Sequence, residues 1–292
     1  MRLRHPSGRI VHLSCGISLD QADSLTAAVD RVYAATTAMR HRFATDRLAV
    51  ALQLPYALAA TLAEDGRART RLRAELDARG LEVITLSGET PDADWSQPIR
   101  LRQTLDLARI LVDLLPAEEV RGSVATCGLA PAEDWDEARQ KAVARNLGRL
   151  SGGLADLAWR VGRAVRAGFQ PGPGYVLDSP EQTVAALTRV DKDRLGVWLD
   201  LSTVLRDWPE QAAGIDRLTD AGLSVITARI TDPAGGWQPV LRHLLAADTA
   251  RTEYVNVDTV RDDEQAADDL AYVLAELTGI GLVPEQLPCT AP

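Results

Sequence analysis

The sequence predicts a single (β/α)8 barrel, in which eight parallel strands alternate with helices. Short apolar runs with strand-like composition recur eight times, and each is followed by a longer segment with the helical spacing of Leu, Ala and Val. Strands that alternate with helices of this length pair in parallel through right-handed crossovers. A chain of 292 residues also suits this architecture, which typically needs roughly 250 residues.

The eight predicted strands follow one another at regular intervals. They cover residues 10–17, 48–54, 81–86, 123–129, 168–170, 195–201, 223–230 and 253–257. The predicted helices between and after them include residues 98–115 and 263–277. Because no linker or low-complexity tract interrupts the pattern, we expect one barrel domain over residues 1–286 and a C-terminal tail over residues 287–292.

Turn and cap residues support the same reading. Gly80 and Gly222 each stand between a helical segment and a strand, as helix C-caps do. Ser179 followed by Pro180 predicts a helix N-cap with proline at the first helical position. The first strand ends without the glycine-rich phosphate turn of open dinucleotide-binding sheets, so closure into a barrel is favoured.

Composition excludes several classes of function. The net charge of −9 argues against a nucleic-acid partner, because phosphate contacts need clustered Lys and Arg. No stretch approaches the roughly 20 apolar residues of a membrane span, and no signal core precedes the first strand. We therefore expect a cytoplasmic protein with no membrane partner. Cys15, Cys127 and Cys289 lie far apart and show no disulfide or zinc-finger spacing.

Residues 94–116, DWSQPIRLRQTLDLARILVDLLP, resemble the third helix of the EboE family of metabolite-traffic proteins. Shorter stretches match in the same order: HLSC at 12–15, ITLSG at 84–88, GSVAT at 122–126, QPGPG at 170–174, LGVWLDLS at 195–202 and EYVNVD at 253–258. The resemblance implies a xylose isomerase-like barrel. In that superfamily, sugar isomerases and epimerases hold a divalent metal with carboxylates and a His at the ends of strands five to eight.

The resemblance also identifies the first candidate site residues. Asp200 and Glu253 match acidic residues of the family, whereas Gln170 stands where a metal-ligand Glu is expected. Thr203 occupies the place of a His, and Arg229 ends the seventh strand where a neutral or metal-binding side chain is expected. If a metal were bound, its ligands would be Asp200, Glu253 and Gln170. We assign no cofactor, and a divalent Mn, Mg, Zn or Co ion stays the open alternative.

The chemistry of these residues leaves alternatives open. A buried Asp200 needs a partner, either a metal, an arginine or a substrate hydroxyl, or it caps the following helix. Arg229 supplies a permanent positive charge in place of a cation, or it extends to solvent. Trp198 shares the strand face of Asp200 and either lines the site or packs in the barrel core. Glu253 stands early in its strand, so it could instead lie deep or outward.

The remaining candidates are substrate-binding residues at other strand ends. Thr126, Asp258 and His12 are assigned this role beside Gln170, Trp198 and Thr203, although His12 also suits a core position. The thiols of Cys15 and Cys127 are interpreted as buried small side chains, because neither has a His at fixed spacing to activate it. The short segment from Ser87 to Trp95 predicts an open site or a larger substrate.

Two functional hypotheses follow. The first is an isomerase- or epimerase-type enzyme that moves a proton on a small polyhydroxylated or phosphorylated metabolite, with Asp200, Glu253 and Arg229 as catalytic residues and an altered, metal-free site. The second is a non-catalytic metabolite-binding or carrier protein with a degenerate isomerase site. A small-molecule metabolite is the expected partner, and a homodimer is conceivable. A metal-dependent nuclease is disfavoured by four His residues and the acidic charge.

Overall fold

The computed structural model describes residues 1–20, 22, 24–43, 45, 47–88, 93–259 and 262–285, and it confirms the predicted barrel. Within these residues, eight parallel strands follow one another around the sheet in sequence order, and the ring closes because the last pairs in parallel with the first. The strands are β2 (Ile10–Ser18), β3 (Leu48–Leu54), β4 (Leu81–Gly88), β5 (Arg121–Thr126), β6 (Ala164–Phe169), β7 (Leu195–Asp200), β8 (Val225–Ile230) and β9 (Tyr254–Val257).

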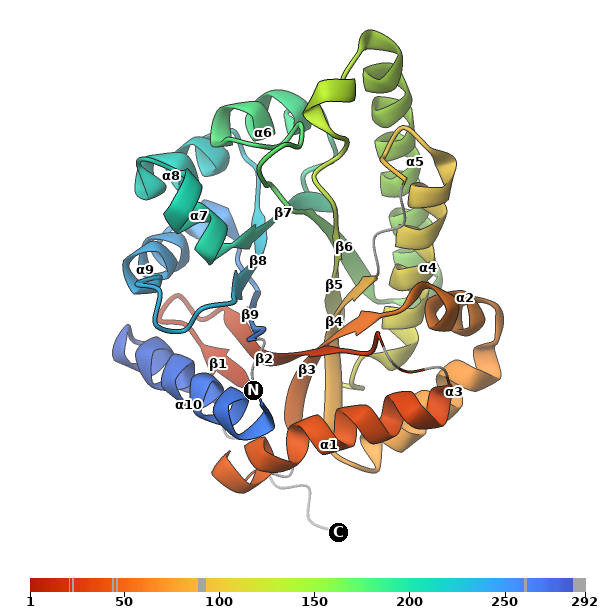
Figure 1. Cartoon of the computed structure of the whole chain (residues 1–292), viewed down its shortest axis with the longest axis vertical. Helices are drawn as coiled ribbons and strands as arrows, with labels where there is room; N and C mark the ends of the chain where they lie inside the picture. Colours follow the sequence, from red (N-terminus) through yellow and green to blue (C-terminus); the bar gives the residue numbers. More distant parts are fainter. Residues whose placement is uncertain are drawn as a thin grey trace.

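Helices surround the ring on its outside (Figure 1). The view runs along the barrel axis, so the strands form the centre and the helices the rim. The helices are α1 (Leu25–Phe43), α2 (Tyr56–Glu64), α3 (Gly66–Asp77), α4 (Pro98–Leu114), α5 (Glu137–Val161), α6 (Pro180–Leu187), α7 (Leu201–Asp207), α8 (Gln211–Asp220), α9 (Gln238–Ala246) and α10 (Asp263–Gly279). Single 3-10 turns cover Ala132–Asp134 and Asp248–Ala250.

Two short strands extend the sheet at the amino-terminal end of the barrel. β1 (Arg2–Arg4) runs antiparallel to the beginning of β2, and β10 (Val283–Pro284) pairs with β1. β1 lies beside the residues that begin β2 and β10 lies on the other side of β1, so both sit far from the strand ends where a TIM barrel carries its function. The sequence pattern did not predict these two strands, because they are only three and two residues long.

The apolar core occupies two separate places. The main cluster packs the outward side chains of the strands, such as Val255 and Val257, against the helices. Since side chains alternate along a strand, Tyr254 and Asn256 then face the inside of the ring. Tyr254 belongs to a second, smaller cluster with Ala49, Ile84 and Ile226. Above this apolar layer the barrel interior becomes polar, which matters for the site described below.

All eight predicted strands are present, and two of them, β5 and β6, differ from the prediction by more than two residues at one end. β5 ends at Thr126 rather than 129, because the chain turns at Leu129, which has a positive φ of 74°. β6 begins at Ala164, four residues before its predicted start. Arg166 made this strand look shorter than it is. The side chain is buried nonetheless, and its Nε donates to the carbonyl of Asp193 at 3.0 Å.

The predicted cap at Ser179 is confirmed, whereas Gly80 and Gly222 lie just beyond the C-cap residues, which are Ala78 and Ala221. Gly80 and Gly222 have φ values of 63° and 75°, the left-handed conformation that glycine adopts without steric cost. Ser179 caps α6 and forms a capping box with Gln182, with Pro180 at the first helical position. Among the described residues, no helix is both long enough and apolar enough to cross a membrane. The predicted tail at 287–292 lies outside the described residues.

Candidate functional site

Four polar side chains meet at the carboxyl-terminal mouth of the barrel. They end or directly follow the consecutive strands β6 to β9, and they are Gln170, Asp200, Arg229 and Asp258. Asp200 lies beside Arg229 in the register of β7 and β8. Because parallel strands end on the same side of a barrel, these side chains share one mouth, which is where TIM barrels position their functional residues.

Arg229 is held between two carboxylates. Its Nε donates to Asp258 Oδ2 at 2.9 Å, and its Nη2 donates to the same oxygen. Its Nη1 lies 3.6 Å from Asp200 Oδ2, and the guanidinium carbon lies 5.8 Å from the centre of the Trp198 ring. The Arg229 side chain is only 25% exposed, so the guanidinium is fixed in the mouth instead of extending freely to solvent.

Asp200 caps a helix as well as facing the arginine. Its Oδ1 accepts a hydrogen bond from the backbone N–H of Ser202 at 2.9 Å and thereby caps α7. The Thr231 hydroxyl donates to the same oxygen at 3.3 Å. Two of the alternatives considered from the sequence, an arginine partner and a helix cap, therefore occur together. Asp200 does not line the cavity described next, so its contact with the site runs through Arg229.

A cavity of about 690 Å³ opens at this mouth. Its inner end is lined by Gln170, Trp198, Arg229 and Asp258, and its outer end lies between α2 and α4. Charged side chains of both signs line that outer end: Glu64, Arg100, Arg102, Asp106 and Arg109. The volume is in the range of cavities that enclose a small molecule, so the mouth can take a ligand of the size of a sugar.

Two glycines make room for the functional side chains. A Cβ at Gly16 would lie 2.7 Å from both Cβ and Cγ of Asp258. A Cβ at Gly168 would lie 3.0 Å from the Cβ of Trp198. The contact at Gly16 is too short for a real side chain, so the position of Asp258 depends on glycine in the neighbouring strand β2, whereas the contact at Gly168 is tight and would displace Trp198 by a few tenths of an ångström.

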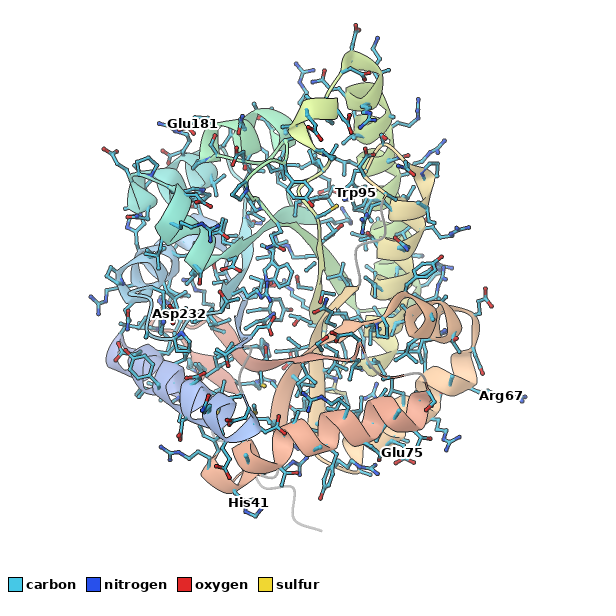
Figure 2. The ribbon with its side chains drawn as sticks, viewed as in Figure 1. His41, Arg67, Glu75, Trp95, Glu181 and Asp232 are labelled. Carbon is cyan, nitrogen blue, oxygen red and sulfur yellow. The ribbon has the colours of Figure 1, made fainter. Side chains whose placement is uncertain are left out.

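Of the other predicted substrate-binding residues, two line the cavity and one does not. Gln170 and Thr126 both face it. The Thr126 hydroxyl accepts a hydrogen bond at 3.1 Å from the ring N–H of Trp95, whose buried side chain lies behind the barrel wall (Figure 2). Thr203 lies on α7 and is not part of the cavity wall. Residues 89–92 of the predicted short segment after Ser87 lie outside the described residues.

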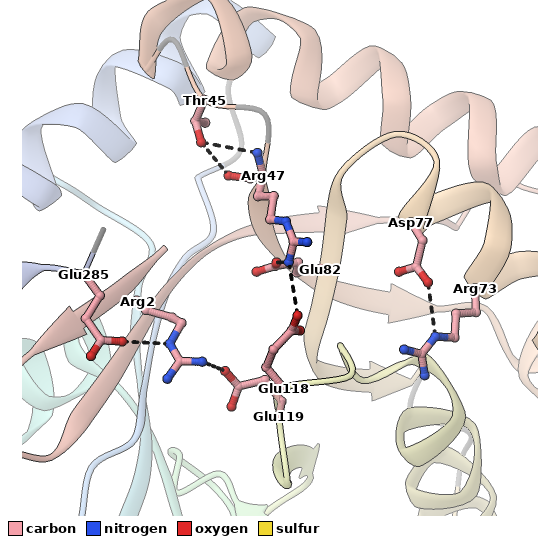
Figure 3. Close-up of polar contacts among 9 residues, drawn as sticks. All are labelled: Arg2, Thr45, Arg47, Arg73, Asp77, Glu82, Glu118, Glu119 and Glu285. Carbon is pink, nitrogen blue, oxygen red and sulfur yellow. Dashed lines mark hydrogen bonds and ion pairs between the residues drawn. The ribbon is translucent and has the colours of Figure 1, made fainter. Parts of the chain in front are cut away.

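Glu253 and His12 lie at the opposite, amino-terminal mouth, so the expectation that they share a site with Asp200 is corrected. Glu253 precedes β9, and its Oε1 accepts a hydrogen bond from Arg121 at the start of β5 at 2.9 Å. The ring of His12 stacks on that of Tyr254, and its Nε2 lies 3.4 Å from Oε2 of Glu119. Ion pairs dominate this end of the barrel, as Figure 3 shows for Arg2 between Glu119 and Glu285.

Cys15 is buried, as predicted, whereas Cys127 is only half-buried. Burial raises the pKa of Cys15 to about 12, and burial also raises the pKa of Cys127. A thiol with a raised pKa stays protonated at neutral pH and is a poor nucleophile. Cys127 lines the cavity and Cys15 is buried, so Cys127 is the thiol that a ligand could contact. Cys289 lies outside the described residues.

Several cavity residues were not predicted from the sequence. Gln53 and Ser87 lie at the carboxyl ends of β3 and β4, and both interrupt apolar strand sequences at the position where functional side chains collect. That signal was available. Gln103 lines the cavity from α4, and its two side-chain polar atoms are buried with no hydrogen-bond partner among the described residues. Its participation depends on how α4 packs, which no local sequence pattern reveals.

The residues of the mouth do not fit the divalent metal that the superfamily implies. No group of three or more His, Cys, Asp or Glu side chains is close enough to hold an ion in the part of the chain that the structure describes. Gln170 contributes no charge, and Glu253 lies at the other mouth. The guanidinium of Arg229 lies between the two remaining carboxylates and would repel a cation placed there.

Comparisons with known proteins define the fold. No family model matches the sequence, and no curated protein matches it. Solved structures do match. An L-ribulose 3-epimerase has a TM-score of 0.67 at 15% identity, with 92% of this chain and 96% of that chain covered. A 3-keto-D-glucoside 4-epimerase from E. coli has a TM-score of 0.61 at 13% identity, covering 92% and 99%.

A third similar structure is a xylose isomerase-like TIM barrel protein from Mycobacterium smegmatis in complex with magnesium. Its TM-score is 0.61 at 15% identity, and the alignment covers 92% of this chain and 97% of that chain. The likeness extends over nearly the whole of each chain. The fold is therefore that of the xylose isomerase-like TIM barrels, while identities this low leave the reaction and the ligand to the residues of the mouth.

Proposed function

We propose that this protein catalyses an isomerase- or epimerase-type proton transfer on a small polyhydroxylated metabolite, in the cavity at the carboxyl-terminal mouth and without a metal ion. The observation that carries the proposal is the ion pair of Arg229 and Asp258 at the inner end of that cavity. The likeness to sugar epimerases supports the same class of reaction.

The chemistry needs a base and a fixed positive charge. Removing a proton from a carbon next to a carbonyl group moves the electron pair onto the carbonyl oxygen and forms an enediolate. Arginine stays protonated at any relevant pH, so Arg229 can stabilise this oxyanion through N–H groups that do not bind Asp258. Both hydrogen bonds from Arg229 reach Oδ2 of Asp258, and Oδ1 remains to accept the substrate proton.

The carboxylates therefore differ in role from the expectation based on sequence. Asp258, assigned above to substrate binding, lines the cavity with a side chain that is 31% exposed, and we assign it the role of base. Asp200 positions Arg229 from outside the cavity. Glu253 is left out of the proposed site. With one base beside the arginine, the proton would leave and return on the same face of the substrate, as in an aldose–ketose interconversion between neighbouring carbons.

A second candidate function is a metabolite-binding or carrier protein. The observation that favours it is the engagement of both carboxylates at the mouth, Asp200 as a helix cap and Asp258 in an ion pair. The resemblance of residues 94–116 to the EboE metabolite-traffic family points the same way. Both functions use the same cavity and differ in whether a bound sugar exchanges a carbon-bound proton.

Proton exchange with solvent tests the proposal directly. The protein is incubated in D2O, with chelator present, with D-fructose, D-allulose, D-tagatose and the matching aldoses, and NMR follows loss of carbon-bound hydrogen. We expect exchange with at least one sugar and a fall of at least about 100-fold in Arg229→Met and Asp258→Asn. Binding of a sugar without exchange would support the carrier function instead.

Matched variants at the other mouth control for effects on the fold. Arg121→Met removes an arginine and Glu253→Gln removes a carboxylate, and both residues lie at the amino-terminal end of the barrel. We expect these variants to keep the full exchange rate. The proposed roles would be contradicted if the variants at the two mouths lost the exchange rate equally, or if Arg229→Met kept the full exchange rate. If no sugar of the panel binds and none exchanges a carbon-bound proton, the proposed substrate class is overturned.

A further inference from the structure

Below the mouth lies a second, much smaller space inside the barrel, which we name the inner chamber. Its volume is about 20 Å³, enough for one water-sized group and too little for a phosphate. Strands on all sides of the ring contribute to its wall, and Trp198 and Asp258 line both the chamber and the large cavity above it. A group that enters the chamber can therefore belong to a ligand that also occupies the mouth.

Four of the residues that line the chamber carry hydroxyl or amide groups that are hydrogen-bonded between strands, and they are Thr85, Ser123, Thr227 and Asn256. Asn256 donates to the Thr85 hydroxyl at 3.2 Å and accepts from the Ser14 hydroxyl at 2.7 Å. Thr227 donates to Ser123 across the ring at 3.4 Å. These contacts connect strands on different sides of the barrel, so the polar wall is held in place without a ligand.

Two residues of the wall each carry a buried polar atom with no hydrogen-bond partner among the described residues. The Ser18 hydroxyl and the ring N–H of Trp198 are both buried and form no hydrogen bond within the described residues. Both residues line the inner chamber. Buried polar groups are almost always hydrogen-bonded, because leaving one unpaired forfeits its interactions with water. An oxygen in the chamber that accepts from Trp198 and exchanges a hydrogen bond with Ser18 would satisfy both.

The charge of the chamber restricts which oxygen fits. Among the described residues that line it, Asp258 is the one ionisable side chain, and its charge is negative. A carboxylate or phosphate would be repelled by Asp258, whereas a neutral hydroxyl can donate to it or to the hydroxyls of the wall. Size and charge therefore select the same group, an uncharged oxygen that bears a hydrogen.

We propose that the inner chamber is a binding subsite for a single neutral hydroxyl, filled by water in the free protein and by the terminal hydroxyl of the ligand in the complex. The second half of this proposal, that the ligand's hydroxyl takes the place of the water, rests on the proposed function. The subsite restricts the substrate class, because the end of the metabolite that enters the barrel is an unmodified CH2OH group. Any phosphate on the substrate is then at the other end, toward α2 and α4.

A crystal structure of the free protein with ordered waters tests the first half without reference to activity. We expect one oxygen in the chamber within hydrogen-bond distance of Ser18 Oγ and Trp198 Nε1. Its density is expected to disappear or weaken in Ser18→Ala and to persist in Ser7→Ala, a control at an exposed position in the turn that precedes β2. A dry chamber in the unaltered protein would overturn the subsite even if the protein proves to be an isomerase.

Binding measurements test the second half. Using calorimetry, the ketohexose that binds best is compared with its 1-deoxy and 6-deoxy analogues and its 1- and 6-phosphates. We expect one deoxy analogue to bind about tenfold more weakly and the phosphate at the same end not to bind. Ser18→Ala should reduce the difference between sugar and deoxy analogue, and a crystal of the complex should show the hydroxyl in place of the water.

The outcomes show whether the oxygen in the chamber comes from water alone or also from the ligand. If the water stays in the chamber while the sugar occupies the mouth, and neither deoxy analogue loses affinity, the ligand half is wrong and the chamber is a hydration site. If no sugar binds at all, the proposed function fails, whereas the water in the chamber still decides whether the subsite exists.

Discussion

Gly16→Ala should displace the proposed base while leaving the barrel folded. The added Cβ would lie 2.7 Å from Cβ and Cγ of Asp258 and 2.8 Å from its Oδ1, where ordinary contacts are 3.4–4 Å. The carboxylate must therefore move by roughly 1 Å. Rotation of the Asp258 side chain cannot relieve the contact, because its own Cβ is one of the atoms in conflict, so the backbone after β9 must shift as well.

The expected consequences differ in size for stability and for activity. Overpacking of this kind costs roughly 1–3 kcal/mol, which for a large domain lowers Tm by about 2–4 °C per kcal/mol. A displacement of about 1 Å at a reacting group lowers the rate by about 100-fold. Gly152→Ala is the matched control, because a Cβ at Gly152 meets nothing within 4 Å and alanine favours the helix.

The assay combines the solvent-exchange rate, calorimetric binding of the same sugar and Tm for both variants. We expect Gly16→Ala to lose solvent exchange while it remains folded at the assay temperature. We expect Gly152→Ala to keep both its exchange rate and its fold. The reasoning is refuted if Gly16→Ala exchanges as fast as the unaltered protein, or if its crystal structure shows the Arg229–Asp258 contact unchanged.

Three further predictions concern the metal, a helix cap and pH. Gln170→Glu combined with Arg229→His should create a site that binds Mn²⁺ in calorimetry, while the unaltered protein shows no binding, since the change supplies two ligands and removes the repelling charge. Ser179→Ala should lower the free energy of unfolding in urea by about 1 kcal/mol, because it removes the cap of α6. Burial alone would raise the pKa of Glu119, but the hydrogen bond and charge of His12 and the charge of Arg2 outweigh it and lower that pKa. Its stabilising contribution is therefore complete above the ordinary glutamate pKa and lost as pH falls through the lower native value, so Glu119→Gln should make stability depend less on pH in acid.

The sequence was sufficient for the barrel because the relevant signals are local. Each strand has its own apolar run, and glycines such as Gly80 and Gly222 end the preceding helices whatever the rest of the chain does. Arg166 shows where this fails: a charge inside a strand shortened the predicted β6, although its guanidinium is bound to backbone carbonyls. β1 and β10 are too short to produce a periodic signal at all.

The site was only partly predictable, because it depends on which end of a strand a residue occupies. Asp200 and Arg229 were placed correctly at strand ends, since each follows a clear apolar run. Glu253 was assigned by resemblance, yet it precedes the first paired residue of β9 and so lies at the opposite mouth, while Asp258 follows the last. The inner chamber needs contacts between strands on opposite sides of the ring, and no single segment contains that information.

The arrangement of charge at the mouth connects the two proposals. A metal ion binds oxygens from any direction by its charge, whereas a guanidinium donates hydrogen bonds only in its own plane, and here two of those donors are already committed to Asp258. The ligand must therefore be oriented by something else. A terminal hydroxyl in the inner chamber would provide that orientation, because Asp258 lines both the chamber and the cavity. The carbons next to that hydroxyl would then lie at the level of Asp258, with a carbonyl oxygen in reach of Arg229. On this account Asp200, Gly16 and Ser18 are as necessary as the reacting pair, since they hold the arginine, make room for the base and fix the substrate.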